Sequence, residues 1–171
     1  MVDDRFSNID KIDIEILKLL TKDARKSFRQ IERDLKDFVK SPITVKKHVE
    51  SLQEKGIIQN YGAKINYEQL GFDIISLIEI TISKGKMLEV ERDIAQDPNI
   101  FGVLDVTGEY DAIILARFRS RTDLSDMVKK INSLEYVIRT NTHLILNVIK
   151  EGADFSALME KERSRKEKST K

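Results

Sequence analysis

The sequence contains no cysteine, and its only histidines are His48 and His143. Without cysteine the chain can form no disulfide, no thiolate metal site and no cysteine nucleophile. Two histidines far apart in the sequence give little basis for a histidine metal site or a serine and histidine catalytic pair. There is no glycine-rich phosphate loop and no metal-ligand motif. We therefore expect no cofactor, no metal and no enzymatic activity.

Long apolar runs are also absent. No stretch approaches the roughly 18 uninterrupted apolar residues of a membrane span. The N-terminal MVDDRFSN carries acidic residues where a signal peptide would carry a basic and then an apolar run. These features predict a cytoplasmic protein without a membrane partner. A hydrophobic share of 40% beside a charged share of 35% indicates a folded chain with a charged surface rather than a disordered one.

Residues 10–36 have the spacing of two amphipathic helices. In the first, apolar side chains recur on one helix face, namely Ile12, Ile16, Leu19 and Leu20. The second begins at Ser27, a preferred N-cap residue, and runs to Lys36. Its expected buried face consists of Phe28, Ile31 and Leu35.

A third helix has the clearest boundaries. Ser41-Pro42 is an N-cap followed by proline at the first helical position, where the missing amide donor costs nothing. Gly56 ends the helix, because glycine suits a left-handed C-terminal cap. Its core-facing residues are Val45, Val49 and Leu52. Together the three helices predict a compact tri-helical unit.

The solvent side of the third helix has residues that a helix-turn-helix unit would use to read DNA. Such units place the N-terminal residues of this helix against base edges, which nominates Ile43, Thr44 and Lys47, with Ser51 on the same side. Ile43 would meet a thymine methyl group and Lys47 a guanine edge. Phosphate contacts give affinity without sequence information, and the candidates for them are Ser27, Arg29, Lys40, Ser41 and Lys46.

The charge distribution favours DNA binding by this part of the chain. The formal net charge is +1, but residues 22–55 hold 10 Lys and Arg against 6 Asp and Glu, whereas residues 63–150 hold 11 against 13. The same spacing also fits a small helical packing unit with a charged solvent side. His48 lies beside the apolar stripe, so we interpret it as a half-buried structural histidine rather than a base reader.

The second half of the chain has the pattern of a sheet. Residues 57–61 read as a strand, and a linker is placed at 58–72, closed by Leu70-Gly71. β-Branched runs follow at 75–82, 101–106, 112–118 and 137–149, with amphipathic stretches at 87–96 and 124–134. The order βαββαβ is that of a ferredoxin-like unit.

These patterns predict four segments. They are a helix-turn-helix domain at 1–57, the linker at 58–72, a ferredoxin-like domain at 73–150 and a charged tail at 151–171. From Met159 the tail lacks apolar periodicity, so we expect a frayed helix or disorder there.

The predicted sheet is apolar on both faces. The first strand has Ile78 and Ile80 on one side but Ile75 and Leu77 on the other. The two helices of a ferredoxin-like unit cover only one face, and an exposed apolar face usually marks a partner surface. We therefore expect a homodimer formed through the open face, which suits DNA sites with two-fold symmetry.

The turn between the second and third strands is a candidate ligand site. It consists of Thr107, Gly108, Glu109, Tyr110 and Asp111, whose glycine permits close backbone approach and whose neighbours offer hydroxyl and carboxylate groups for a small amphoteric ligand. On the last strand Arg139, Thr140 and Thr142 would complete a polar pocket or face solvent. The alternative is a tight hairpin turn with Tyr110 packed at its edge.

The chain resembles the Lrp/AsnC, or feast/famine, transcription regulators over residues 8–150. The matching segments are IDKIDIEILKLLTKDAR at 9–25, SPITVKKHVESLQEKGII at 41–58, Leu70-Gly71, and the turn 107–111. The segment 32–40 departs from the family pattern, because it is longer and lacks the usual turn glycine. The tail after Lys150 also extends beyond the usual end of the family.

The resemblance implies an α+β fold with an N-terminal winged helix-turn-helix and a C-terminal ferredoxin-like βαββαβ domain, joined by a β-strand hinge. Family members bind amino acids near the turn matched by residues 107–111, form dimers and commonly assemble into octamers. The implied partners are double-stranded DNA, a small effector and further copies of the chain. The implied function is a sequence-specific transcription regulator whose assembly or DNA occupancy responds to an amino acid.

Two other functions compete with this interpretation. An architectural protein that coats DNA without a ligand would show weak sequence preference and a steep salt dependence. A regulatory subunit of a metabolic enzyme is a more distant alternative, since no catalytic constellation is visible in the sequence. RNA binding through the sheet is disfavoured, because the strands lack stacking aromatic residues.

Overall fold

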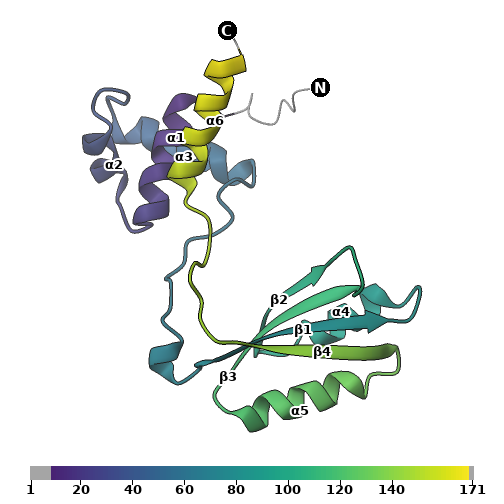
Figure 1. Cartoon of the computed structure of the whole chain (residues 1–171). Helices are drawn as coiled ribbons and strands as arrows, with labels where there is room; N and C mark the ends of the chain where they lie inside the picture. Colours follow the sequence, from purple (N-terminus) through teal and green to yellow (C-terminus); the bar gives the residue numbers. More distant parts are fainter. Residues whose placement is uncertain (1–8, 170–171) are drawn as a thin grey trace. The chain divides into compact units, whose positions relative to one another are not determined.

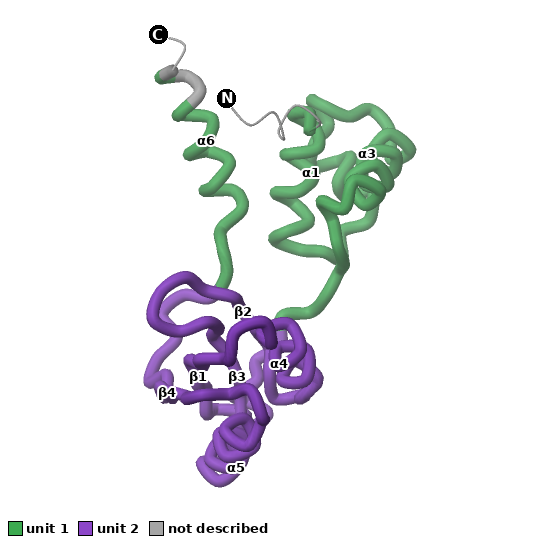
Figure 2. Tube along the Cα trace, turned by 90° about the vertical axis from the view of Figure 1, so that its right-hand side faces the viewer, with its two compact units in different colours: residues 1–64, 152–171 green, residues 65–151 purple. Residues whose placement is uncertain are grey.

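A computed structural model describes residues 9–169 and divides the chain into two compact units. Unit 1 comprises residues 1–64 and 152–171, and unit 2 comprises residues 65–151 (Figure 2). The N-terminal MVDDRFSN, on which the signal-peptide argument rests, and the last residues of the predicted tail lie outside the described residues. No helix in the described part of the chain is long and apolar enough to cross a membrane.

Unit 1 is helical (Figure 1). Its elements are α1 (Lys11–Lys22), α2 (Phe28–Asp34), α3 (Pro42–Glu54) and α6 (Phe155–Ser169). The first three begin where the sequence predicts, because each has a side-chain cap that accepts a hydrogen bond from an otherwise unpaired amide of the first turn: Asp10 for α1, Ser27 for α2 and Ser41 for α3. Helix α3 has Pro42 in its first turn, and Gly56 follows it with a φ of 68°.

The core of unit 1 confirms the expected inner face of α3. Val45, Val49 and Leu52 are buried, as are Ile31 and Leu35 of the second segment. Phe28 was expected on that face and is 38% exposed, so this part of the prediction is wrong. Helix α2 ends at Asp34, before the expected Lys36. The turn that follows it then brings Val39 into the core, where it is 1% exposed.

The chain before unit 2 differs from the expectation, whereas the chain after it follows one of the two expected alternatives. Residues 57–61 form no strand. The amides of Ile57 and Ile58 donate to the carbonyl oxygen of Leu52, at 2.9 and 3.1 Å, and so close the end of α3. A strand needs a hydrogen-bonded neighbour, and the part of the chain that the structure describes places none beside this segment. In the tail, residues 155–169 form helix α6, a helix being one of the two alternatives expected there, and α6 contacts α1.

Unit 2 is a four-stranded antiparallel sheet with two helices. Its elements are β1 (Ile74–Ile82), α4 (Met87–Ile94), β2 (Ile100–Asp105), β3 (Ala112–Phe118), α5 (Arg121–Asn132) and β4 (Val137–Ile145). The strand order is β2-β3-β1-β4. A short 3-10 turn, Glu68–Leu70, and Gly71 at a φ of 80° precede β1. The predicted α+β fold with its ferredoxin-like βαββαβ domain is confirmed.

Alternation along β1 separates a core face from an open face. Ile78, Ile80 and Ile82 are buried together with residues of β3, α4 and α5. Ile75 and Leu77 lie on the other face and are only half-buried. The apolar character of both faces therefore agrees with the prediction, whereas dimerisation through the open face stays a prediction.

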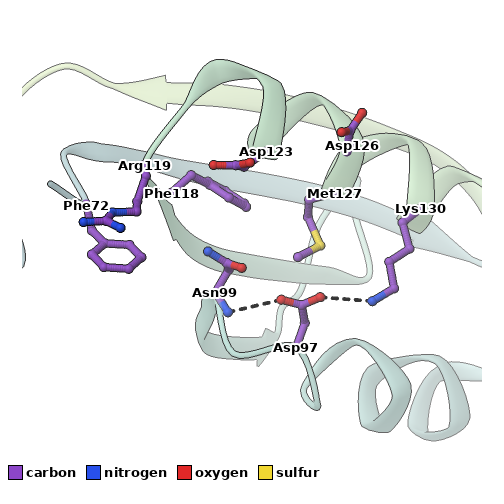
Figure 3. Close-up of a pocket in the computed structure, with 9 residues that line it drawn as sticks. All are labelled: Phe72, Asp97, Asn99, Phe118, Arg119, Asp123, Asp126, Met127 and Lys130. Atoms are coloured by element: carbon purple, nitrogen blue, oxygen red, sulfur yellow. Dashed lines mark hydrogen bonds and ion pairs between the residues drawn. The ribbon is translucent and has the colours of Figure 1, made fainter.

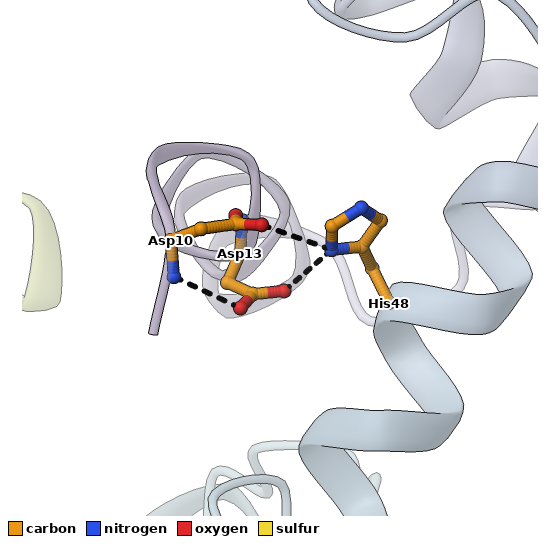
Figure 4. Close-up of side chains that lie close together, drawn as sticks. All are labelled: Asp10, Asp13 and His48. Atoms are coloured by element: carbon orange, nitrogen blue, oxygen red, sulfur yellow. Dashed lines mark hydrogen bonds and ion pairs between the residues drawn. The ribbon is translucent and has the colours of Figure 1, made fainter. Parts of the chain in front are cut away.

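Helices α1 and α3 are joined by a polar contact inside unit 1 (Figure 4). The amide of Asp13 donates to Asp10 at 2.8 Å, and the amide of Asp10 donates to Asp13 at 3.1 Å, which caps α1. The other oxygen of Asp13 lies 2.7 Å from Nδ1 of His48 on α3. Asp13 is buried, and the side chain of His48 is 20% exposed. This geometry supports a structural role for His48.

We predict that His48→Ala destabilises unit 1 by about 1–3 kcal/mol, because it leaves one oxygen of the buried Asp13 carboxylate without its partner. Urea unfolding followed by far-ultraviolet circular dichroism measures this change. Glu54→Ala, at an exposed position of the same helix, is the matched control and should leave the midpoint nearly unchanged. Equal midpoints for His48→Ala and the control would contradict the prediction.

Unit 2 contains an uncommon buried acid, Glu91 of α4, which is 9% exposed. Its Oε1 has no hydrogen-bond partner within the described residues. Burial, and next the hydrogen bond with Asp105 at the end of β2, raises the pKa of Glu91 from 4.5 to about 7. The folded state therefore binds this proton more tightly than the unfolded state does. The resulting stabilisation is fully present below pH 4.5 and is lost as the pH rises through about 7.

We predict that Glu91→Gln reduces the loss of stability with rising pH, because a neutral amide needs no proton to remain buried. The melting temperature, measured in a pH series from 4.5 to above 7, should fall with pH in the wild type and much less in the variant. Asp93→Asn, at an exposed position of the same helix, controls for removal of one negative charge. A fall of equal size in wild type and Glu91→Gln would show that another group is responsible.

Candidate functional site

The N-terminal end of α3 is open to solvent. Ile43 is 67% exposed, and Thr44 and Lys47 are exposed beside it. No polar contact of the Lys47 side chain is found within residues 9–169, whereas Lys46 lies 3.5 Å from Glu50. The side chain at the centre of the predicted reading face is thus uncommitted and able to meet a base edge.

The predicted phosphate-binding residues divide into two groups. The hydroxyls of Ser27 and Ser41 act as helix caps, accepting from the amides of Gln30 at 3.3 Å and Ile43 at 3.1 Å. Serines that cap helices in this way mark the helix N-termini, and the backbone amides of an N-terminus attract anions such as phosphate. Arg29 and Lys40 are exposed, although the Lys40 ammonium donates to a backbone carbonyl of the preceding turn at 3.1 Å. Ser51, which was expected on the reading side, is half-buried.

The turn at 107–111 is fixed to β1 through Asp111. The Asp111 amide donates to the carbonyl of Ile80 at 2.9 Å, and its carboxylate accepts from the amide of Ile82 at 2.7 Å. Between Thr81 and Ile82 the register of β1 with β4 shifts, and Asp111 pairs the amide on one side of that irregularity. Gly108 has a φ of 135°, a conformation that favours glycine. Asp111 therefore positions the turn rather than pointing freely toward a ligand.

Glu109 and Tyr110 of this turn meet Arg139 of β4. The Arg139 guanidinium donates to Glu109 at 2.7 Å and lies 4.8 Å from the centre of the Tyr110 ring. Its Nε is 3.4 Å from the hydroxyl of Thr81. The hydrogen bond to Glu109 is the main cause that raises the pKa of Arg139. The structure thus brings together three of the predicted effector residues across a wide sequence separation.

Thr140 and Thr142 do not join this group. Thr140 is paired with Ile80 and Thr142 with Ile78, two residues of the core face, while Arg139 is opposite Thr81 on the open face. The Thr140 hydroxyl donates to Asn132 of α5 at 3.1 Å. Successive side chains of a strand point to opposite faces, so these threonines lie on the helix side. Thr107 and Gly108 are exposed at the tip of the turn.

A second polar group on the open face was missed by the sequence reasoning. Glu79 of β1 accepts from the amide of Asn141 at 2.8 Å and lies 3.0 Å from Nε2 of His143. The hydrogen bond with His143 is the main cause that lowers the pKa of Glu79. Alternation from Arg139 would have placed Asn141 and His143 on one face, but their pairing with Glu79 depends on register, which the sequence does not reveal.

Comparison with known proteins identifies the family. The model of the Lrp/AsnC ligand binding domain matches residues 76–155. An uncharacterized HTH-type transcriptional regulator of Pyrococcus horikoshii is 41% identical over 143 residues, which cover 84% of this chain and 95% of that protein. The chain belongs to the Lrp/AsnC family of transcriptional regulators.

Solved structures agree with this assignment. Escherichia coli AsnC superposes on this Lrp/AsnC regulator with a TM-score of 0.78 at 25% identity, covering 85% of this chain and 97% of AsnC. A regulator of Neisseria meningitidis, solved as a complex with L-Met, gives a TM-score of 0.77 at 23% identity and covers 85% of this chain and 95% of its own. The second likeness shows the fold alone.

This Lrp/AsnC regulator also has a cavity of about 370 Å³ in unit 2 (Figure 3). Buried Phe118 and Met127 contribute apolar surface. Lys130 and Asp97, which lie 3.0 Å apart, are at its margin. The lining comes from several segments that are distant in the sequence, which is why spacing arguments missed it. Its lining combines this apolar surface with charged side chains, among them Arg119, Asp123 and Asp126.

Proposed function

We propose that the chain is a sequence-specific DNA-binding transcription regulator whose assembly or DNA occupancy responds to a small effector, an amino acid. The observation that carries the DNA-binding part is the open N-terminal end of α3, where Ile43 is 67% exposed beside the uncommitted Lys47. At the N-terminal end of a helix that enters the major groove, an exposed apolar side chain is placed to contact a thymine methyl group.

The effector part of the proposal rests on the ligand-binding domain and on the charged group at the turn. An amino acid carries a carboxylate and an ammonium group, and Arg139 and Glu109 offer the two complementary charges. The L-Met complex of the Neisseria regulator is a property of that protein. It makes amino acids the first class of probe to test.

We further propose a homodimer built through the open face of the sheet. Ile75, Leu77, Ile113 and Leu115 lie on this face and remain only half-buried in the single chain. Covering them with a second copy would remove apolar surface from water. A two-fold dimer would present two α3 helices to the half-sites of a symmetric operator. Assembly beyond the dimer, up to an octamer, follows from the family resemblance only.

The base-reading and phosphate-binding roles of unit 1 are separable. We predict that Lys47→Ala weakens binding to the preferred DNA by about 1–3 kcal/mol and relaxes sequence preference at one position. Arg29→Ala should weaken binding to all sequences alike and reduce the slope of log K against log salt by about 1. Fluorescence anisotropy titrations at several salt concentrations measure both quantities. If Lys47→Ala instead weakened binding to all sequences alike and Arg29→Ala relaxed the sequence preference, Lys47 would contact phosphate and Arg29 would read a base.

The whole proposal is tested by anisotropy of the full chain with upstream and random genomic DNA fragments, with and without a pool of the twenty amino acids. We expect selective binding that the pool changes. Selective binding unaffected by the pool would reject the amino-acid effector and leave a DNA-binding regulator. Equal, weak and steeply salt-dependent binding to all fragments would favour an architectural protein, and the absence of binding at low salt would reject both.

A further inference from the structure

The contact between Arg139 and Glu109 is an unusual feature for a ligand site, because the chain itself occupies it. Glu109 Oε1 accepts one hydrogen bond from the guanidinium at 2.7 Å. The side chains of Arg139 and Glu109 are 50% and 71% exposed, so the pair lies in water rather than in the core. Exposed ion pairs contribute little free energy. Another carboxylate can therefore displace Glu109 at small cost.

The guanidinium is better held than the carboxylate that it binds. The ring of Tyr110 lies 4.8 Å from the Arg139 guanidinium carbon, and the Thr81 hydroxyl lies 3.4 Å from Nε. The turn beneath is fixed by the hydrogen bond from the amide of Ile82 to the carboxylate of Asp111. Only one guanidinium nitrogen binds Glu109, whereas a free carboxylate can take two parallel hydrogen bonds from arginine. A ligand would gain a contact that Glu109 does not make.

We propose that Glu109 is an internal competitor for the effector, and that a zwitterion binds by inserting into this ion pair. The carboxylate of the ligand takes the place of Glu109 on Arg139, and the released Glu109 then accepts hydrogen bonds from the ammonium group of the ligand. The inference rests on the proposed effector site at the turn. It specifies the ligand as a small molecule that carries both charges, and it assigns a separate partner to each.

A ligand site built from this ion pair would prefer a zwitterion to a carboxylate or an amine alone, which a lone arginine would not do. A carboxylate without an ammonium group would displace Glu109 and leave it without a cation, so it would bind less well than the zwitterion. An amine without a carboxylate would supply no anion to replace Glu109 on Arg139, so the ion pair would stay intact. Discrimination would thus come from an unpaired charge in the wrong complex rather than from added contacts in the right one.

The test uses the full chain and three matched probes. Each of the twenty amino acids is first screened by its effect on the melting temperature, and the strongest is titrated by calorimetry. The same side chain is then titrated as the deaminated acid and as the amino acid amide, which lack the ammonium and the carboxylate. We expect the amino acid to bind at least about tenfold tighter than either, the factor for one lost charge-assisted hydrogen bond.

Two variants separate the roles. Glu109→Gln should strengthen binding of the deaminated acid and reduce the preference for the amino acid by about tenfold, because the competitor and the ammonium partner are lost together. Arg139→Lys should weaken both carboxylate probes, since it keeps the charge and loses the planar fork. Both positions are exposed, so both variants should fold, and circular dichroism checks this. Glu89→Gln, which removes an exposed carboxylate from the 2.8 Å pair with Lys86, is the control and should change nothing.

The outcomes distinguish this inference from the proposed function. An unchanged preference in Glu109→Gln overturns the inference while the amino-acid response of DNA binding can stand. Binding that neither variant alters would place the ligand elsewhere, with the cavity beside Phe118 as the next place to examine. If no amino acid binds while the chain still binds DNA selectively, the inference fails and the DNA-binding function remains.

Discussion

Strand β1 is the element on which unit 2 depends, because it is a central strand that pairs with β3 on one side and is the strand that holds β4 on the other. Ile78 pairs with Ile114 of β3 and with Thr142 of β4. Ile78 and Ile80 are fully buried, whereas Leu77 and Glu79, which alternate with them, lie on the open face. The two-residue period of this one strand therefore decides which side chains build the core and which are left for a ligand or a second copy.

The same strand also determines where the residues of the proposed effector site come together. At its end the register with β4 shifts between Thr81 and Ile82, and the amide of Ile82 is bound by Asp111 instead of lacking a partner. Arg139 lies opposite Thr81 and so projects toward Glu109 and Tyr110 of the turn. A shift of one residue would send Arg139 to the helix side, as alternation does for its neighbour Thr140.

Local chemistry explains what the sequence predicts well. Ser41-Pro42 and Gly56 bound α3 as expected, since caps act on adjacent residues. The six elements of unit 2 follow from their apolar period, although boundaries move by a few residues. Non-local geometry explains the failures. The expected strand at 57–61 has no neighbour to pair with, and grouping Thr142 with Arg139 ignored the face on which each residue lies. The pairing of Glu79 with His143 needs a register that no local pattern contains.

The chain passes between the two units twice, once before unit 2 and once after it. Helix α6 belongs to unit 1 and contacts α1, so the chain leaves unit 1 before unit 2 and returns to it afterwards. Because β1 and β4 are antiparallel, Ile75 near the start of β1 pairs with Ile145 at the end of β4, and both connections leave the sheet at the same end. Thr81 and Arg139 lie at the other end of this strand pair, about 20 Å away at 3.3 Å per residue. Under the proposal above, a ligand that releases Glu109 from Arg139 would act on the two strands that continue covalently into the helical unit. Any coupling between the sites needs these strands to have two arrangements that differ in ligand affinity.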